Sequence, residues 1–254
     1  MSPLADPWIL RPKPDPRARA RLLCFPYAGG GASLFRTWTD GLPPEIELCA
    51  VQPPGREARL GERPYARLDP LVAALVPALR GHLGTPFAVF GHSLGALVAF
   101  ELVRALRRVG LPGPRWLFAS AFRAPDLPDL QPPLHRLPEP VFWDELRRLN
   151  GTPSEVLDSD ELRHLIEPTL RADFAVHETY VYSTGEPLDC PISAFGGDSD
   201  REVSADMVDG WRRHTRGDFI KRMLPGDHFF IHSSRALLLE ALAADLERLL
   251  SRLD

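Results

Sequence analysis

The sequence predicts an α/β fold, in which helices flank a mostly parallel sheet, and three observations support this prediction. Six short runs are almost continuously apolar, as strands buried on both faces should be. Helical patterns alternate with these runs, which is the order expected for a parallel sheet covered by helices. The 254 residues are 44% hydrophobic and 25% charged, so one domain of this class can bury a sizeable core without disulfides or metals.

The predicted elements follow one another along the chain. Strands are predicted at residues 21–26, 46–52, 86–91, 115–121, 190–196 and 219–224. Helices are predicted at about residues 33–40, 69–82, 94–109, 204–214 and 234–252. Asp69 and Pro70 resemble an N-cap followed by a first helical residue, and Gly110 suits the left-handed conformation at a helix end. Pro77 should kink or shorten the helix that contains it.

One interval, from Pro125 to Tyr182, breaks the alternation because it contains no clear run of strand length. Six prolines fall within residues 125–140, and helical patterns follow at residues 139–149 and about 160–182. Inserted segments of this kind in α/β sheets are more often lids or binding elements than independent domains.

This interruption predicts the organisation of the chain. We expect a helical lid insertion at residues 125–185, within an α/β core formed by residues 21–124 and 186–254. Residues 1–20 carry five prolines within the first sixteen positions and are predicted to form a weakly ordered N-terminal arm.

The charge balance and the cysteines exclude several classes of protein. Counting 30 Lys and Arg against 34 Asp and Glu gives a net charge of −4, whereas nucleic-acid-binding proteins normally carry a basic excess. The scattered Cys24, Cys49 and Cys190 indicate reduced thiols rather than a disulfide framework. The chain has no uninterrupted run of 18 apolar residues and no secretory signal. We therefore expect a cytoplasmic monomer that neither binds nucleic acid nor spans a membrane.

The most informative segment is G-H-S-L-G at residues 91–95, which follows an apolar run of strand length and precedes an amphipathic helical pattern. A serine on a sharp turn between a strand and a helix projects its hydroxyl above the sheet, and flanking glycines remove side chains that would collide across the turn. Ser93 is therefore the predicted nucleophile. A simple Gly/Ser turn would explain the motif alone, but not its position between a strand and a helix.

A serine hydroxyl needs a base, and the base needs a carboxylate to orient it. When the serine lies on such a turn, the acid and then the histidine follow it in the chain. Asp200 follows the strand and glycine turn at residues 191–197, and His228 follows the last predicted strand. Both loops should open at the carboxyl edge of the sheet, where ligands bind in open α/β sheets. Asp198 is an alternative to Asp200, which we favour because it stands further past the turn.

Two backbone amides are expected to form an oxyanion hole. Leu94, directly after the nucleophile, supplies one, and Ala28, beside the glycine run that follows the first strand, supplies the other. That glycine run has neither of the common phosphate-binding spacings. His228 and His232 are four residues apart, but no H-E-x-x-H motif or nearby cysteine accompanies them. No metal site and no cofactor are predicted.

Five segments together resemble one known family, the type II thioesterases. These are the stand-alone editing enzymes of bacterial polyketide and nonribosomal peptide synthesis. The segments are CFPYAGG at 24–30, VQPPGR at 51–56, GHSLG at 91–95, GWRRHT at 210–215 and GDHFF at 226–230. The similarity runs from about Arg21 to Leu250. One departure is Asp227, because the family more often has a second glycine before the histidine.

The resemblance implies an α/β-hydrolase fold with a helical lid and a catalytic triad of Ser93, Asp200 and His228. It also implies that the partner is an acyl or peptidyl carrier protein, and that the enzyme hydrolyses aberrant or stalled acyl groups from its phosphopantetheine arm. The triad alone is equally compatible with a general carboxylesterase or an acyltransferase. A non-catalytic binding protein of the same fold is the alternative from another class, although such proteins commonly lose a triad residue.

Overall fold

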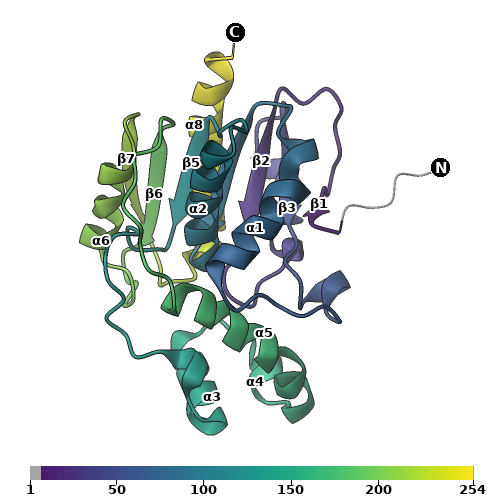
Figure 1. Ribbon diagram of the computed structural model, residues 1–254, viewed down its shortest axis with the longest axis vertical. Coiled ribbons are helices and arrows are strands. Elements are labelled where there is room, and N and C mark those ends of the chain that lie inside the picture. Colours follow the sequence, from purple (N-terminus) through teal and green to yellow (C-terminus); the bar gives the residue numbers. More distant parts are fainter. Residues whose placement is uncertain (1–6, 254) are drawn as a thin grey trace, which may run out of the picture.

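The computed structural model describes residues 7–253 and confirms the predicted α/β fold (Figure 1). Its sheet has the strand order β1-β3-β2-β4-β5-β6-β7. Neighbouring strands run parallel, except that β1 is antiparallel to β3. The strands are β1 (Ile9–Leu10), β2 (Ala20–Phe25), β3 (Ile46–Val51), β4 (Phe87–His92), β5 (Trp116–Ser120), β6 (Ile192–Gly197) and β7 (Phe219–Leu224). All except β1 lie where the apolar runs predicted them.

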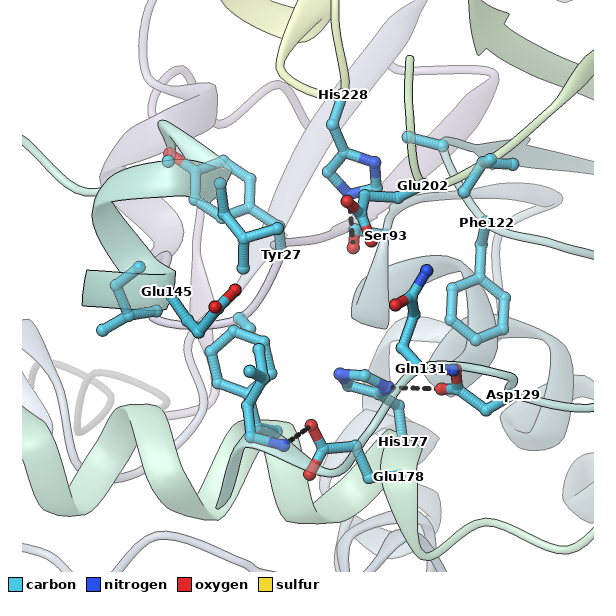
Figure 2. A pocket seen from close by; sticks show the side chains of 18 of the residues that line it. Tyr27, Ser93, Phe122, Asp129, Gln131, Glu145, His177, Glu178, Glu202 and His228 are labelled. Atoms are coloured by element: carbon cyan, nitrogen blue, oxygen red, sulfur yellow. Dashed lines mark hydrogen bonds and ion pairs between the residues drawn. The ribbon is translucent and has the colours of Figure 1, made fainter. Parts of the chain in front are cut away.

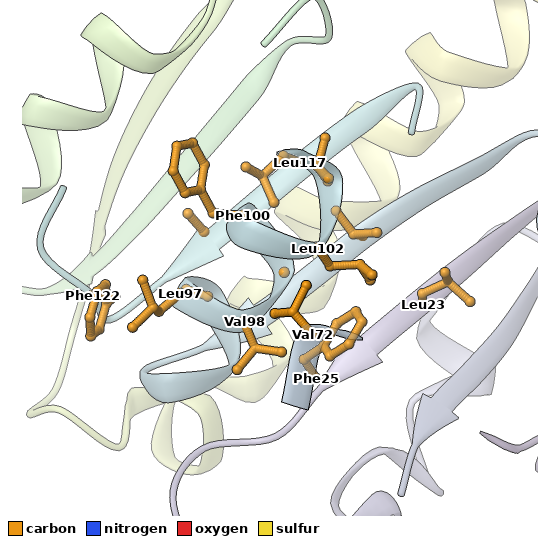
Figure 3. Close-up of a cluster of buried hydrophobic side chains, with 14 of the residues drawn as sticks. Leu23, Phe25, Val72, Leu97, Val98, Phe100, Leu102, Leu117 and Phe122 are labelled. Atoms are coloured by element: carbon orange, nitrogen blue, oxygen red, sulfur yellow. The ribbon is translucent and has the colours of Figure 1, made fainter. Parts of the chain in front are cut away.

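Helices cover both faces of the sheet, so its strands are apolar on both sides. α1 (Leu68–Leu79) and α2 (Leu94–Arg108) lie on one face, and α8 (Arg235–Ser251) lies on the other (Figure 1). Successive strand residues point to opposite faces. Leu23 therefore packs in the cluster under α2 that Figure 3 shows, whereas the adjacent Leu22 packs in the cluster under α8.

Three helices between β5 and β6 lie beyond one end of the sheet (Figure 1). They are α3 (Glu139–Leu149), α4 (Ser154–Leu157) and α5 (Asp160–Glu178). These helices share a small apolar cluster of their own, which includes Phe142, Leu157 and Leu170. They occupy the interval in which the sequence loses its strand pattern, and we call α3–α5 the helical insertion below.

Two of the predicted helices are divided into shorter elements in the structure, and the helix predicted at about residues 160–182 ends at Glu178. The segment predicted at 33–40 forms 3₁₀ turns at Ala32–Phe35 and Thr39–Gly41. Phe35 ends the first turn and Trp38 directly precedes the second, and both side chains are buried against Phe90. The segment predicted at 204–214 is divided in the same way, into α6 (Ala205–Asp209) and a 3₁₀ turn at Gly210–His214.

The predicted helix ends agree only in part with those in the structure. Gly110 has the expected positive φ, of +68°. The helix that contains Pro77 ends at Leu79 and continues only as a 3₁₀ turn, as a shortened helix should. The prediction that Asp69 is an N-cap is wrong, because α1 begins at Leu68 and the N-cap is Arg67, which makes no capping hydrogen bond with its side chain. Asp69 lies in the first turn, where its charge still favours the helix dipole.

Two short helices and one short strand were not predicted, namely α4, α7 (Phe230–Ser233) and β1. β1 lies within the predicted N-terminal arm and pairs Ile9 with Val51 of β3. Residues 1–6 of that arm lie outside the described residues. Among residues 7–253, no helix combines the length and the apolar character that crossing a membrane requires.

Candidate active site

Ser93 lies at the sharp turn between β4 and α2. Its backbone has φ +54° and ψ −122°, a conformation that a residue other than glycine adopts only at a cost, and its N–H donates to the carbonyl of Ser120 across 2.7 Å. The backbone packs closely here: a Cβ on Gly91 would lie 2.1 Å from the Gly95 carbonyl oxygen, and one on Gly95 would lie 2.2 Å from that of Phe25. The two glycines therefore allow the turn that exposes the serine hydroxyl.

His228 lies between Ser93 and Asp200. Its Nε2 is 2.9 Å from Ser93 Oγ, and its Nδ1 is 2.9 Å from Asp200 Oδ2. The other carboxylate oxygen of Asp200 accepts hydrogen bonds from the backbone N–H groups of Glu202 and Val203. The carboxylate is completely buried, so its orientation is fixed from both sides. This arrangement allows His228 to take a proton from Ser93 while Asp200 holds the imidazole.

The alternative acid, Asp198, points elsewhere. Its Oδ1 accepts hydrogen bonds from the Ser199 hydroxyl and from the backbone N–H of Gly226. It joins the two loops that carry Asp200 and His228, and its carboxylate makes no hydrogen bond with His228 among the described residues.

The turn Tyr27–Gly30 follows β2 and carries the Ala28 amide. Gly30 N–H donates to the Tyr27 carbonyl across 2.9 Å, and Gly29 has φ +78°, as the third residue of a type II turn must. Neither the Ala28 amide nor the Leu94 amide donates to another described residue. Ala28 lines the same cavity as Ser93. Both amides are thus free to bind an oxygen that carries negative charge.

His92 lies directly behind this site, although no sequence pattern predicted a role for it. It is fully buried, with Nδ1 2.9 Å from Ser120 Oγ and Nε2 2.9 Å from the backbone oxygen of His228. Burial, and then the charge of His228, lower the pKa of His92 well below its ordinary value of 6.5. The ring is therefore neutral, with its proton on Nε2 and the Ser120 hydroxyl donating to Nδ1. Its place beside the nucleophile was the only signal in the sequence.

A cavity of about 580 Å³ adjoins Ser93 and His228. Figure 2 shows the side chains that surround it. Its apolar walls come largely from the helical insertion and the segment before it, with Leu130, Leu134, Leu137, Val141, Leu146, Leu149, Leu170 and Phe174. Asp129, Gln131 and His177 add polar groups (Figure 2). A cavity of this size and composition can hold an apolar chain whose reacting end lies at Ser93.

No group of three or more His, Cys, Asp or Glu residues that could hold a metal ion is found within residues 7–253. Cys24, Cys49 and Cys190 are free and buried. Burial raises the pKa of the Cys49 and Cys190 thiols to about 12, so neither is a ready nucleophile.

Comparison with known proteins gives a consistent result. The family model described as "Thioesterase domain" matches residues 20–250, a range that contains Ala28, Ser93, Asp200 and His228. The gramicidin S biosynthesis protein GrsT of Aneurinibacillus migulanus is 41% identical over 96% of this chain and 95% of that protein. The thioesterase PikA5 of Streptomyces venezuelae is 40% identical over 89% of this chain and 80% of that protein.

A similar backbone is found among solved structures. The type II thioesterase BorB from the borrelidin biosynthetic cluster matches with a TM-score of 0.87 and 35% identity, covering 96% of this chain and 99% of that one. The similarity therefore extends over the sheet and the helical insertion together.

Proposed function

The chain belongs to the thioesterase family, and from this premise we propose that it is a type II thioesterase that hydrolyses acyl groups from carrier proteins. Its substrate is an acyl thioester on the phosphopantetheine arm of an acyl or peptidyl carrier protein in polyketide or nonribosomal peptide synthesis. The relatives support this, because they include a gramicidin S biosynthesis protein and a type II thioesterase of a biosynthetic cluster. The observation that carries the proposal is the contact series from Asp200 through His228 to Ser93.

The proposed mechanism begins with the thioester carbonyl beside Ser93. Ser93 Oγ attacks the carbonyl carbon, His228 Nε2 takes the hydroxyl proton, and Asp200 stabilises the resulting imidazolium. The carbonyl π electrons move to oxygen, and the Ala28 and Leu94 amides bind this oxyanion. The carbon–sulfur bond then breaks, and the thiolate of the arm leaves with the proton from His228.

Water completes the proposed reaction. His228 removes a proton from a water molecule as it attacks the acyl-serine, and the second tetrahedral intermediate expels Ser93 Oγ, which takes that proton back. The products are a free carboxylic acid and the carrier thiol. The acyl chain lies in the cavity, and the segment 125–185 acts as a lid over it.

The test is a hydrolysis panel of carrier-protein thioesters whose acyl groups increase in length, alongside simple oxoesters of the same acids. We expect release of free acid from the thioesters and faster turnover than with the oxoesters. Ser93→Ala should abolish hydrolysis and leave the circular dichroism spectrum unchanged, because the small side chain fits the same turn. Retained hydrolysis in that variant would remove Ser93 from the mechanism.

The panel also separates the proposed function from its alternatives. Faster turnover of oxoesters would identify a general carboxylesterase, and an ester or amide product would identify an acyltransferase. A folded protein that hydrolyses nothing and does not react with a fluorophosphonate at Ser93 would be a binding protein.

A further inference from the structure

The helical insertion reaches back into the loops beside Ser93 through a single buried carboxylate. Asp173, on α5, accepts a hydrogen bond from the backbone N–H of Gly29 across 2.7 Å. Arg56 donates to both oxygens of the same carboxylate, across 2.6 Å and 2.9 Å. The side chains of Arg56 and Asp173 are only 8% and 7% exposed. A bidentate ion pair of this kind fixes direction as well as distance.

The position of Gly29 makes this contact relevant to the oxyanion hole. Gly29 is next to Ala28 in the type II turn, and its N–H belongs to the central peptide of that turn. Type I and type II turns differ by a flip of this central peptide. Since Asp173 accepts from the Gly29 N–H, it favours the orientation of the central peptide that is found in the type II turn.

The neighbouring peptide groups are fixed as well. The Tyr27 carbonyl accepts from Gly30 N–H, and in a trans peptide the Ala28 N–H points the opposite way from that carbonyl. Arg56 also donates to the Gly30 carbonyl, across 3.2 Å. Asp173 therefore holds the central peptide of the turn through the Gly29 N–H, and Arg56 holds the last residue of the turn through the Gly30 carbonyl.

The pairing with Arg56 also neutralises the negative charge of the Asp173 carboxylate. An unpaired carboxylate close to the oxyanion hole would repel the negative charge that develops on the substrate oxygen. Arg56 contacts both oxygens of Asp173, so the pair is neutral overall and does not oppose that charge.

The adjacent turn of α5 packs against the same loops. The hydroxyl of Thr169 donates to the Gly55 carbonyl across 2.6 Å, and a Cβ on Gly29 would lie 2.6 Å from Leu170. The part of α5 that begins at Thr169 is therefore fixed to the loops that carry Ala28 and Arg56.

We propose that Asp173 and Arg56 are positioning residues that hold the Tyr27–Gly30 turn so that the Ala28 amide faces the oxyanion. The helical insertion thus contributes to the catalytic machinery as well as to the walls of the cavity. This inference rests on the proposed function, because it concerns the oxyanion hole of the same reaction.

The test compares Asp173→Asn and Arg56→Lys with a matched control, Asp245→Asn. Asp245 is also a buried carboxylate that accepts from both terminal nitrogens of one arginine, Arg222, but it lies on α8, which covers the opposite face of the sheet from α1 and α2 (Figure 1). Three quantities are measured: kcat and KM for an acyl N-acetylcysteamine thioester, affinity for a trifluoromethyl ketone of the same acyl chain, and affinity for the thioether in which a methylene replaces the carbonyl. The ketone forms an oxyanion when Ser93 Oγ adds to its carbonyl carbon and His228 takes the proton, whereas the thioether forms none.

Asp173→Asn should lower kcat by about tenfold to a hundredfold, because removing a whole oxyanion donor costs about 10²–10³-fold. Its affinity for the ketone should fall by a similar factor, while KM and thioether affinity stay unchanged. Arg56→Lys should act in the same direction, since an ammonium cannot pair with both oxygens in a fixed plane. Asp245→Asn should lower the urea midpoint and leave kcat unchanged.

Either of two results would overturn the proposal. One is an unchanged kcat and ketone affinity in Asp173→Asn, and the other is an equal loss of thioether and ketone affinity. Should Asp173→Asn fail to fold, Arg56→Lys decides by the same ratios. A wild-type protein that neither hydrolyses the thioester nor binds the ketone would instead contradict the proposed function itself.

Discussion

The Nε2–H of His92 donates a hydrogen bond to the backbone carbonyl of His228 across 2.9 Å. The two imidazole rings also meet edge to face, with centroids 5.8 Å apart. On its other side, His92 accepts from the hydroxyl of Ser120, whose backbone carbonyl accepts from Ser93 N–H. One buried side chain thus connects the loop of the proposed base to the strand beside the proposed nucleophile.

Replacing His92 by leucine should therefore impair both stability and turnover. The His228 carbonyl and the Ser120 hydroxyl would lose their partner, at a cost of about 1–3 kcal/mol in the free energy of unfolding. We expect kcat to fall by about tenfold or more, because small displacements of catalytic groups cost large factors in rate. Urea denaturation and steady-state kinetics measure the two effects. His92→Gln retains a donor near Nε2 and should recover part of kcat; equal kcat in wild type and His92→Leu would contradict this role.

The depressed pKa of His92 predicts that the protein becomes less stable in mild acid. Below pH 6.5 the unfolded chain binds a proton on this residue that the folded protein excludes, because burial lowers the pKa of the folded imidazole. Its contribution to stability is complete above pH 6.5 and is lost as the pH falls towards the folded-state pKa. The slope from this group approaches ~1.4 kcal/mol per pH unit.

Urea unfolding at a series of pH values between 7 and 5 measures this slope. Burial also lowers the pKa of His214, so part of the slope remains without His92. The His92→Gln variant should show a smaller slope than the wild type. Identical slopes in the two proteins would show that His92 is protonated in the folded state.

Local patterns predicted most of the sheet because a strand buried on both faces is apolar at nearly every position. β1 was not predicted, because Ile9 and Leu10 form too short an apolar run to be recognised in the sequence. These two residues form a strand because they pair with β3. The tight turns at Ala32–Phe35 and Thr39–Gly41 were not predicted for another reason. Their geometry depends on the burial of Phe35 and Trp38 against a distant strand, and local helix propensity carries no information about that burial.

The residues of the candidate site also fall into two groups, those that local sequence patterns predict and those that only contacts in the folded protein identify. Ser93 was predicted by a motif whose neighbours along the chain explain its geometry, and His228 by its place after the last strand. The sequence left Asp198 and Asp200 open because both follow the same turn, and only their hydrogen bonds distinguish them. Asp173 went unnoticed because its partner Arg56 lies 117 residues away in the chain.

The two aspartates provide a direct test of the triad. Asp200→Asn should reduce kcat by about 10⁴-fold, because an amide favours the wrong imidazole tautomer at His228. Asp198→Asn should retain most of the activity, since an amide oxygen can still accept from the Gly226 N–H. Steady-state kinetics on one thioester compares the two variants. The assignment is wrong if Asp198→Asn proves the more damaging substitution.

The close packing of the nucleophile turn predicts a strong effect of one added methyl group. In Gly95→Ala, the new Cβ would lie 2.2 Å from the Phe25 carbonyl oxygen and 2.7 Å from that of Pro26. Both contacts are with backbone, which cannot move aside as a flexible side chain could, so α2 must shift away from β2. We expect a loss of at least about 3 kcal/mol in the free energy of unfolding, at the upper end for overpacking.

Gly84→Ala is the matched control, because a Cβ there has no atom within 4 Å. It should change stability by no more than about 0.5 kcal/mol, as for other exposed positions. Urea denaturation of both variants measures the difference. Since Gly95 lies two residues after Ser93, a destabilised Gly95→Ala that still folds should also react more slowly with a fluorophosphonate. If Gly95→Ala were as stable and as reactive as Gly84→Ala, the close approach of α2 to β2 would not be needed to form the turn.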